Sequence, residues 1–344
     1  MFSRLSFILP FVLLSVSCKT KSPSRSSSIE PNSAVIINGG DNNIDVLDLN
    51  SLKIKDKIWL KTDGNTFSHH IYFSKSRKYV SIALPYFDFS KGHDGMHHMS
   101  VPGKVIVLNT SDGKVKVEIE VPQANHNAII SPDEKEIWTA GMSHSGRVYV
   151  YDIETGSLKN QIVVDADPSE IIFSKDEKYA VVSCGESSFV TVIDIAAKTI
   201  IKEIKVDPNP GNVWPGLDNS IFVENSIRKT LNIVDLNALK AVDFIDFDFT
   251  PGFMVYNPKT LEIWVCSKSD DNVYIFKKGA DKWEKTATFA SSNGPHMIAF
   301  SDQFSKAILI NQFGNTAIVI NAETKKEIKR IATGNKPNGI AVWE

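Results

Sequence analysis

The chain of 344 residues contains 42% hydrophobic and 23% charged side chains, together with 19 Gly and 15 Pro. This composition is typical of a folded protein and excludes collagen-like, coiled-coil and wholly disordered classes. A net charge of −2 provides no field that would steer the chain onto polyphosphate, so we expect no nucleic-acid partner. Three cysteines are too few for a disulfide framework.

The N-terminal segment has the pattern of a bacterial export signal. Arg4 gives a basic start, residues 5–14 are mostly apolar, and small residues precede Cys18. The apolar run is short for a membrane span and contains Pro10, which favours a cleaved signal over a permanent transmembrane helix. Its end resembles a bacterial lipoprotein signal. The resemblance implies that residues 1–17 are removed and that Cys18 receives a lipid, with a plain secretory signal as the alternative.

Residues 18–33 are rich in Lys, Ser and Pro and contain almost nothing to bury, so they are predicted to form a flexible tether. The lipoprotein resemblance implies a membrane partner through the lipid at Cys18. It places the protein in the bacterial cell envelope, either periplasmic or at the outer membrane or surface. Lys19 after the cysteine disfavours retention at an inner membrane under the usual sorting logic. We expect a monomer.

From residue 34 onward, the sequence is a series of short runs rich in Val, Ile, Phe and Tyr, bounded by Gly, Asn, Asp and Pro. Seven similar segments each open one repeat unit, and they begin at Phe67, Asn125, Asp167, Asn209, Thr250, Gly294 and Lys336. After a first spacing of 58 residues, the spacings are 42, 42, 41, 44 and 42 residues. Each complete unit contains four strand-like runs, which is typical of a propeller blade.

The last unit keeps only its first strand, in residues 336–344, and residues 34–66 supply the three missing strands. We therefore predict an all-β fold, a seven-bladed β-propeller over residues 34–344, closed by pairing of N-terminal strands 34–66 with C-terminal strand 336–344. Closure removes the sheet edges that an open array would expose. Cys184 and Cys266 end second strands of units that are not neighbours, so we expect no disulfide between them.

The units resemble the YVTN-type seven-bladed propellers of bacterial and archaeal surface and periplasmic proteins. The resemblance is carried by a strand that starts with Pro and a small residue, a Ser-Lys-Asp turn and a V-x-V-I-D strand, as in DPSEIIFSKDEKYAVVS and FVTVIDI. It covers nearly the whole chain after the tether. Such propellers include binding proteins, scaffolds and several kinds of enzyme. The resemblance therefore implies the fold and leaves the function open.

All eight histidines of the chain fall in connections that reach one face of the predicted propeller. Connections into the first strand of a blade carry His69, His70, His126 and His296. Connections between second and third strands carry His93, His97, His98 and His144. His69 and His296 share one repeat position at the mouth of the innermost strand, so we expect both to point into the axial channel. The alternation of side chains along a strand leaves the directions of His70 and His126 open.

The one long departure from the repeat is an insertion in the first blade, residues 85–103. It carries His93, His97 and His98 together with two methionines, two aspartates and three aromatic residues. Because the insertion lengthens a connection on the histidine-bearing face, we predict that it forms a lid over the channel mouth.

Imidazole and thioether groups with a few carboxylates suit copper, zinc or a haem-type cofactor, and do not suit magnesium or calcium. We predict a metal or cofactor site on the histidine-bearing face. His69, His126 and His296 are its channel-wall ligands, and His97 and His98 close it from the lid.

Two families resemble this arrangement of histidines. The copper propeller of nitrous-oxide reductase is similar through HHIYFS and NGPHMIAFS, although this chain lacks the cupredoxin domain that follows the propeller in that family. The haem-carrying propeller of periplasmic nitrite reductases is similar in placing histidines at this rim. No C-x-x-C-H haem-attachment motif occurs in this chain.

Other interpretations stay open at the level of sequence. Histidines also serve as polar plugs in a wet channel, and the same face could hold a protein, peptide, glycan or other small ligand without a metal. A lactonase-like enzyme would need Glu and Asn residues near the axis, for which Glu170, Asn127 and Asn212 are candidates. No motif of the common hydrolases or nucleotide-binding proteins occurs.

Overall fold

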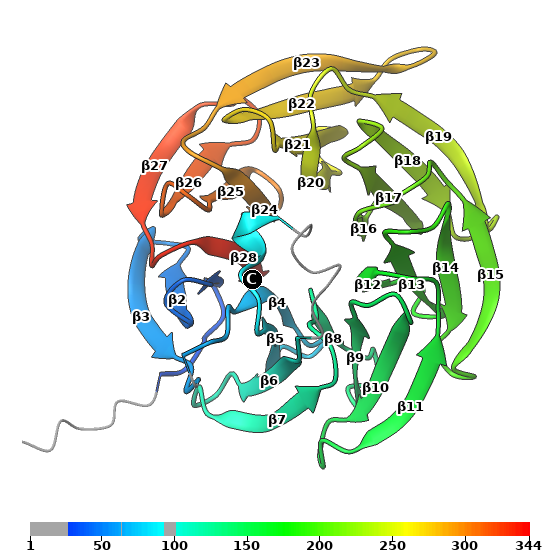
Figure 1. Cartoon of the computed structure of the whole chain (residues 1–344). Coiled ribbons are helices and arrows are strands. Elements are labelled where there is room, and N and C mark those ends of the chain that lie inside the picture. Colours follow the sequence, from blue (N-terminus) through cyan, green and yellow to red (C-terminus); the bar gives the residue numbers. More distant parts are fainter. Residues whose placement is uncertain (1–26, 63, 93–100) are drawn as a thin grey trace, which may run out of the picture.

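The computed structural model describes residues 27–62, 64–92 and 101–344. Seven four-stranded antiparallel sheets are arranged as blades around a central axis (Figure 1). This arrangement confirms the all-β, seven-bladed propeller. The predicted signal peptide, the predicted lipidation site Cys18 and the predicted lid residues His93, His97 and His98 lie outside the described residues.

The first strand of every blade lies next to the axis and the fourth strand lies at the outside (Figure 1). Blade 1 contains β4 (His69–Phe73), β5 (Tyr79–Pro85), β6 (Gly103–Asn109) and β7 (Val115–Val121). Blade 2 contains β8 (Ala128–Ile130), β9 (Glu136–Gly141), β10 (Arg147–Asp152) and β11 (Leu158–Val163). Blade 3 contains β12 (Pro168–Phe173), β13 (Tyr179–Cys184), β14 (Phe189–Asp194) and β15 (Thr199–Lys205).

The remaining blades follow the same order, and the last one combines both ends of the chain. Blade 4 contains β16 (Val213–Pro215), β17 (Ser220–Asn225), β18 (Thr230–Asp235) and β19 (Lys240–Asp246). Blade 5 contains β20 (Pro251–Asn257), β21 (Glu262–Ser267), β22 (Asn272–Lys278) and β23 (Trp283–Ala290). Blade 6 contains β24 (Pro295–Ser301), β25 (Lys306–Asn311), β26 (Thr316–Asn321) and β27 (Glu327–Ala332). Blade 7 contains β28 (Pro337–Trp343), β1 (Ser33–Asn38), β2 (Asn43–Asp48) and β3 (Lys53–Trp59).

Burial decreases from the inside of each blade to its outer edge. All six residues of β1, with the sequence SAVIIN, are buried. In the outer strand β15, with the sequence TIIKEIK, only one residue is buried. Lys and Glu on such an outer strand discourage pairing with a second molecule. The hydrophobic core therefore lies between neighbouring blades and holds the inner strands, which carry the functional side chains, in fixed positions.

Blade 7 closes the ring by pairing the two ends of the chain. β28 pairs antiparallel with β1, and the register begins with Ser33 opposite Trp343. This pairing confirms the predicted closure. The carboxylate of Asp45, which is 1% exposed, accepts a hydrogen bond from the Gly334 N–H at 2.8 Å and pairs with Lys57 Nζ at 2.6 Å. It thus ties the last connection of the chain to β2.

The chain contacts the propeller before residue 34, inside the segment predicted to be a tether. Ile29 is 1% exposed, and its N–H donates to the Thr110 carbonyl at 2.7 Å.

Cys184 and Cys266 are free, buried thiols. Burial raises the pKa of both thiols far above the usual value.

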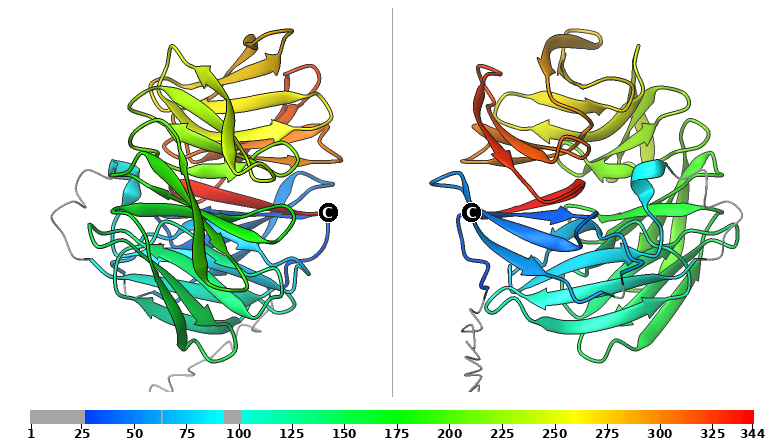
Figure 2. Two further views of the ribbon diagram at one scale, coloured as in Figure 1. Left: turned by 90° about the vertical axis from the view of Figure 1, so that its right-hand side faces the viewer. Right: turned by 60° about the vertical axis from the view of Figure 1, so that its left-hand side comes forward.

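A short 3-10 helix and the C-terminus lie on opposite faces of the ring. The 3-10 helix η1 (Phe89–Lys91) lies in front of the centre of the ring, on the face where the inner strands begin (Figure 1). The C-terminus lies on the opposite face (Figure 2). The described start of the predicted lid, residues 85–92, therefore lies at the mouth of the axial channel.

No helix within the described residues is long and apolar enough to cross a membrane.

Candidate metal centre

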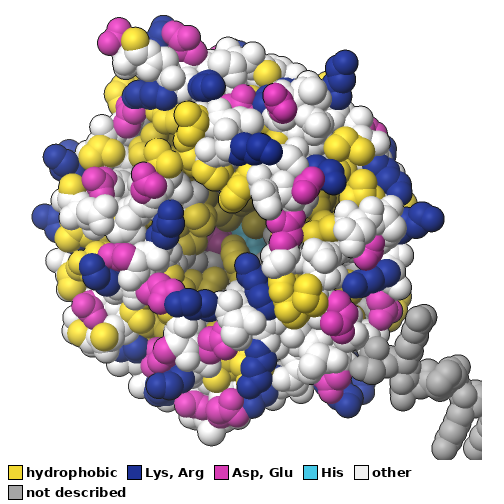
Figure 3. Space-filling view, turned by 180° about the vertical axis from the view of Figure 1, so that it is seen from behind, with side chains coloured by type: hydrophobic (Ala, Val, Ile, Leu, Met, Phe, Trp, Pro, Cys, Tyr) yellow, Lys and Arg dark blue, Asp and Glu magenta, His cyan; other side chains and the backbone are white. Residues whose placement is uncertain are grey.

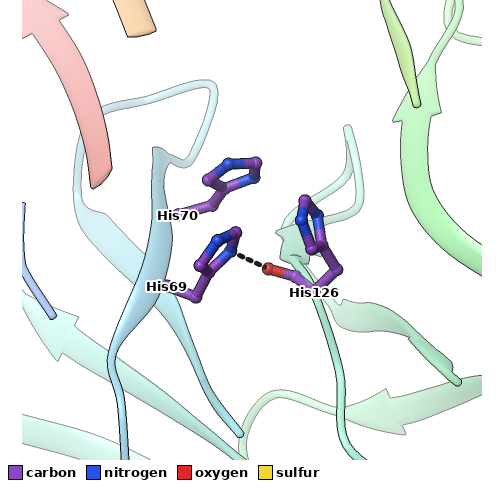
Figure 4. A group of neighbouring side chains, drawn as sticks. All are labelled: His69, His70 and His126. Atoms are coloured by element: carbon purple, nitrogen blue, oxygen red, sulfur yellow. Dashed lines mark hydrogen bonds between the residues drawn. The ribbon is translucent and has the colours of Figure 1, made fainter. Parts of the chain in front are cut away.

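Three histidine rings meet at the mouth of the axial channel. His69 and His70 lie at the start of β4, and His126 lies just before β8 in the next blade (Figure 4). The ring centroids are separated by 4.2 Å between His69 and His70, 4.2 Å between His69 and His126, and 4.6 Å between His70 and His126. One ring nitrogen from each lies within 4.8 Å of the other two, and all three side chains are buried. We call these three residues the histidine trio.

A bulge in β4 turns two consecutive side chains toward the same side. The pairing of β4 with β5 shifts register between His69 and Ile71, and His70 has a left-handed φ of 41°. In a regular strand, His69 and His70 would point to opposite faces of the sheet. Gly339 of β28 allows the backbone to approach closely here, because a Cβ at this residue would lie 2.9 Å from the Cα of His70.

A buried carboxylate, Glu170 of β12, organises the histidine trio. It is 0% exposed and accepts hydrogen bonds from the Tyr72 hydroxyl at 2.7 Å, Asn127 Nδ2 at 2.6 Å and His126 Nδ1 at 2.7 Å. His70 Nδ1 lies 3.4 Å from the same carboxylate. Burial, followed by the negative charge of Glu170, raises the pKa of Tyr72 far above its usual value. Tyr72 therefore remains a protonated donor.

These hydrogen bonds assign the tautomers of two rings. His69 Nδ1 donates to the backbone carbonyl of His126 at 2.9 Å, and His126 Nδ1 donates to Glu170. A neutral imidazole that is protonated on Nδ1 carries its lone pair on Nε2. This tautomer, with a carboxylate or carbonyl behind the ring, is the one that metal-ligating histidines commonly adopt.

The histidine trio forms one wall of a cavity of about 830 Å³. Aromatic side chains border the trio within this cavity. The ring centroid of Phe89, from η1, is 5.3 Å from that of His69, and that of Trp214 is 5.7 Å from that of His70. Viewed from the opposite face, the centre of the ring is a hollow bordered by hydrophobic side chains, with a histidine visible at its bottom (Figure 3).

An ion pair between blades holds η1 over the cavity. Lys336 Nζ, just before β28, lies 2.7 Å from the Asp88 carboxylate and donates to Ser90 Oγ at 2.9 Å. Asp88 also caps η1 by accepting a hydrogen bond from the Ser90 N–H at 3.0 Å. These contacts place the ring of Phe89 against the histidine trio.

A second buried carboxylate, Glu224 of β17, lies on another wall of the cavity. It is 0% exposed and pairs with Lys268 Nζ at 2.6 Å. It also accepts hydrogen bonds from Trp214 Nε1 at 3.2 Å and Asn212 Nδ2 at 3.3 Å. Burial raises the pKa of Glu224, but the charge of Lys268 and the hydrogen bonds outweigh this effect, so the pKa lies below its usual value.

His296, at the start of β24, lies beside the histidine trio and outside its compact group. Its ring centroid is 6.2 Å from those of both His69 and His70, and its Nδ1 is buried without a hydrogen-bond partner. Burial, followed by the charges of His70 and Lys268, lowers the pKa of His296 to about 3, against the opposing effect of a backbone hydrogen bond with Asn338.

The low pKa of His296 predicts a pH-dependent stability. The folded-state pKa lies below the unfolded value of about 6.5, so the unfolded chain binds more protons between these values and stability falls as the pH falls below 6.5. Between pH 7 and pH 5, the wild type should lose about 2 kcal/mol more unfolding free energy than His296→Gln. Denaturant unfolding in the presence of a chelator measures this difference. Equal losses in the two proteins would contradict the buried neutral ring.

The other predicted site residues are placed as follows. The side chain of His144, in the connection after β9, is 64% exposed and pairs with Glu186 at 2.8 Å at the rim of the cavity. Asn127 and Glu170 bind each other, whereas Asn212 binds Glu224. The three residues considered for a lactonase are therefore divided between two carboxylate clusters.

The fold and the site define a class: a seven-bladed β-propeller with a histidine-lined cavity at one end of its axis. The chain matches no protein-family model and no curated protein. The YVTN resemblance therefore stays a prediction.

Several solved structures share the fold. A functionally unknown protein from Desulfotomaculum acetoxidans has a TM-score of 0.72 and 16% identity, over 91% of this chain and 99% of that chain. The periplasmic gluconolactonase PpgL of Pseudomonas aeruginosa has a TM-score of 0.70 and 14% identity, over 91% of this chain and 99% of that chain. The dihydro-heme d1 dehydrogenase NirN, in complex with DHE, has a TM-score of 0.64 and 17% identity, over 92% of this chain and 76% of that chain. At these identities, the similarity shows the fold alone.

Proposed function

We propose that the protein is an extracytoplasmic β-propeller that binds one transition-metal ion at His69, His70 and His126. The observation that carries the proposal is the convergence of three buried imidazoles, with one nitrogen of each within 4.8 Å of the others. Imidazole ligands favour copper and zinc over magnesium and calcium. The function is metal carriage, sensing or redox work at this site.

The donor set fits such an ion. Nitrogens around a tetrahedral zinc lie about 3.4 Å apart at bond lengths of about 2.1 Å, so ring movements of about 1 Å bring the histidine trio to bonding distance. Glu170 supplies a negative charge behind the rings, which partly balances the charge of a divalent ion. Three protein ligands leave an open coordination position, which is the arrangement of reactive rather than purely structural sites.

A haem-type cofactor fits the cavity in size but not in charge. A tetrapyrrole carries carboxylates, whereas Asp270, Asp271 and Glu186 line the cavity. Lys268 is the one lysine or arginine among the described lining residues, and it already pairs with Glu224. We therefore favour a bare copper or zinc ion over a tetrapyrrole.

Metal analysis of the full chain, purified without a polyhistidine tag, tests the proposal. After incubation with copper(II), zinc or cobalt(II) and removal of free metal, we expect one equivalent of at least one ion in the wild type. A variant combining His69→Ala, His70→Ala and His126→Ala should retain none. His144→Ala is the matched control, because this exposed rim histidine lies outside the trio, and it should bind as the wild type does. His296→Ala should also keep the full equivalent.

Two outcomes would overturn the metal proposal. One is a wild type that binds none of the three ions while its circular dichroism shows a folded β protein. The other is a folded triple variant that retains the full equivalent. The first result would favour the second interpretation, a propeller that recognises a protein, peptide or glycan without a metal. The second result would show that the ion binds at residues other than the histidine trio.

We further propose that the chain is anchored to a bacterial membrane through a lipid on Cys18. The signal-like residues 1–17 support this proposal, and similar structures include a periplasmic gluconolactonase. Cys18→Ser should abolish incorporation of labelled fatty acid and release the protein from the detergent phase, whereas Ser17→Ala should retain both. Equal labelling of Cys18→Ser and the wild type would refute the anchor.

A further inference from the structure

The cavity is far larger than a metal ion requires. Its volume of about 830 Å³ falls within the range of sites that enclose small organic molecules, about 300–1,000 Å³. The histidine trio forms only one wall, and the cavity continues along blades 4, 5 and 6, where it is lined by residues such as Trp214, Phe253 and Phe313. An ion held by three ligands would present its open coordination position to this space.

The part of the cavity away from the trio has aromatic and apolar walls. The rings of Trp214 and Phe253 are 4.7 Å apart in an edge-to-face arrangement deep in the cavity. At the mouth, Phe313 is 49% exposed and Ile227 is 73% exposed. Large apolar side chains that remain exposed around a concave site indicate a surface that a ligand covers.

The charges around the mouth disfavour an anionic ligand. Asp167, Asp270 and Asp271 line the cavity together with the paired carboxylates Glu186 and Glu224. Among the described residues that line the cavity, Lys268 is the one lysine or arginine and it is already held by Glu224, so a ligand carboxylate would face like charges there without an available lysine or arginine. A positively charged group would be attracted, both by the carboxylates and by the faces of the aromatic rings.

We infer that the cavity binds a small organic molecule with an aromatic body and no negative charge, which donates a nitrogen or oxygen atom to the metal ion held by the histidine trio. The inference rests on the proposed metal site and names the class of its ligand. The aromatic body lies between Trp214, Phe253 and Phe313. Any cationic group points toward the aspartates at the mouth.

The cobalt(II)-loaded full chain tests this inference, because a new ligand on cobalt changes its visible absorption. The probes are imidazole and 4-phenylimidazole, which share one donor group and differ by one ring. We expect 4-phenylimidazole to bind about ten-fold more tightly than imidazole, since the phenyl group becomes buried against the aromatic wall.

The chain offers a matched pair of variants for this measurement. Phe313 and Phe304 both belong to connections of blade 6 and are 49% and 43% exposed, but only Phe313 lines the cavity. Phe313→Ala should reduce the preference for 4-phenylimidazole several-fold and leave imidazole binding unchanged. Phe304→Ala should behave as the wild type does.

A second pair of probes tests the charge of the ligand. 4-Phenylimidazole with a para-aminomethyl group should bind at least ten-fold more tightly than the same molecule with a para-carboxylate, and added salt should reduce this difference. Equal affinities of imidazole and 4-phenylimidazole for the cobalt-loaded protein would overturn the inference while leaving the metal site intact. A preference for the carboxylate probe would also overturn it. Failure to load cobalt, copper or zinc would instead refute the proposed function.

Discussion

Deletion of residues 336–344 is expected to leave the protein unfolded. These residues contain β28, the innermost strand of blade 7, so their loss unpairs one edge of β1, whose six residues are all buried. Each fully buried aliphatic side chain contributes about 1.5–3 kcal/mol, and a domain has only about 5–15 kcal/mol of net stability. Exposing Val35, Ile36 and Ile37 together with the loss of Ile340 is therefore comparable to the whole stability.

Thermal unfolding and limited proteolysis measure this effect. The truncated chain should show no cooperative melting transition and should be digested by trypsin under conditions in which the wild type is resistant. A protease-resistant, cooperatively melting truncated protein would show that blade 7 does not hold the ring together.

A circular permutant serves as the control, because it moves the chain ends to another blade and keeps β28. It therefore separates the effect of losing β28 on stability from the effect of moving the C-terminus. Ser33 and Trp343 are paired neighbours and residue 27 lies six residues before Ser33, at most about 20 Å of extended chain, so a Gly-Ser linker of about ten residues can join residue 344 to residue 27. New termini in the exposed turn at Asn237 and Ala238 leave every blade complete. This permutant should melt within a few degrees of the wild type, because closure depends on the pairing of β28 with β1 and not on where the chain begins.

The fold could be predicted from the sequence because its signal repeats. Each blade must bury its inner strands and expose its outer strand. The same pattern of apolar and polar residues therefore occurs seven times along the chain. The shared blade could be inferred because residues 34–66 lack a first strand and residues 336–344 lack the other three. The prediction of the blades and the prediction of the shared blade both depend only on the residue pattern and the segment lengths. Neither requires knowledge of the direction in which a side chain points.

The composition of the site was predictable only in part. Its residues share repeat positions at the mouths of inner strands, and this placed His69 correctly in the channel wall. The direction of the neighbouring His70 side chain does not follow from the sequence, because strand alternation does not anticipate the bulge at His70 or the close approach of Gly339. His296 shares the repeat position of His69 but lies outside the compact trio.

Glu170 is not identified from the sequence as an organiser of the proposed metal site, although the sequence contains a signal for it. In the aligned repeats, Glu170 occupies the position of His70, two blades away. A carboxylate at this repeat position does not by itself indicate its partners, and only the structure shows that Tyr72, Asn127 and His126 all direct donors to Glu170. Glu170 and its donors come from three separate blades. The spacing of these residues along the chain therefore does not predict that they meet.

Glu170→Gln is expected to lower metal affinity by about 10–100-fold, the usual effect of losing a carboxylate behind a ligating histidine. The amide keeps the size of the side chain, but it removes the negative charge near the ion and presents an NH₂ group to one of the donors that now bind the carboxylate. Cobalt(II) titration followed by visible absorption measures the affinity. Denaturant unfolding without metal measures the accompanying loss of stability, about 1–3 kcal/mol for one unsatisfied buried group.

Glu224→Gln is the matched control for this substitution. Glu224 is also 0% exposed and borders the same cavity, but it binds Lys268, Trp214 and Asn212 instead of the histidine trio. It should lose a similar amount of stability and keep its cobalt affinity within about two-fold of the wild type, because its charge is already balanced by Lys268. If both variants lost affinity equally, the effect would come from general loosening of the cavity. If Glu170→Gln bound cobalt as the wild type does, Glu170 would serve only the fold.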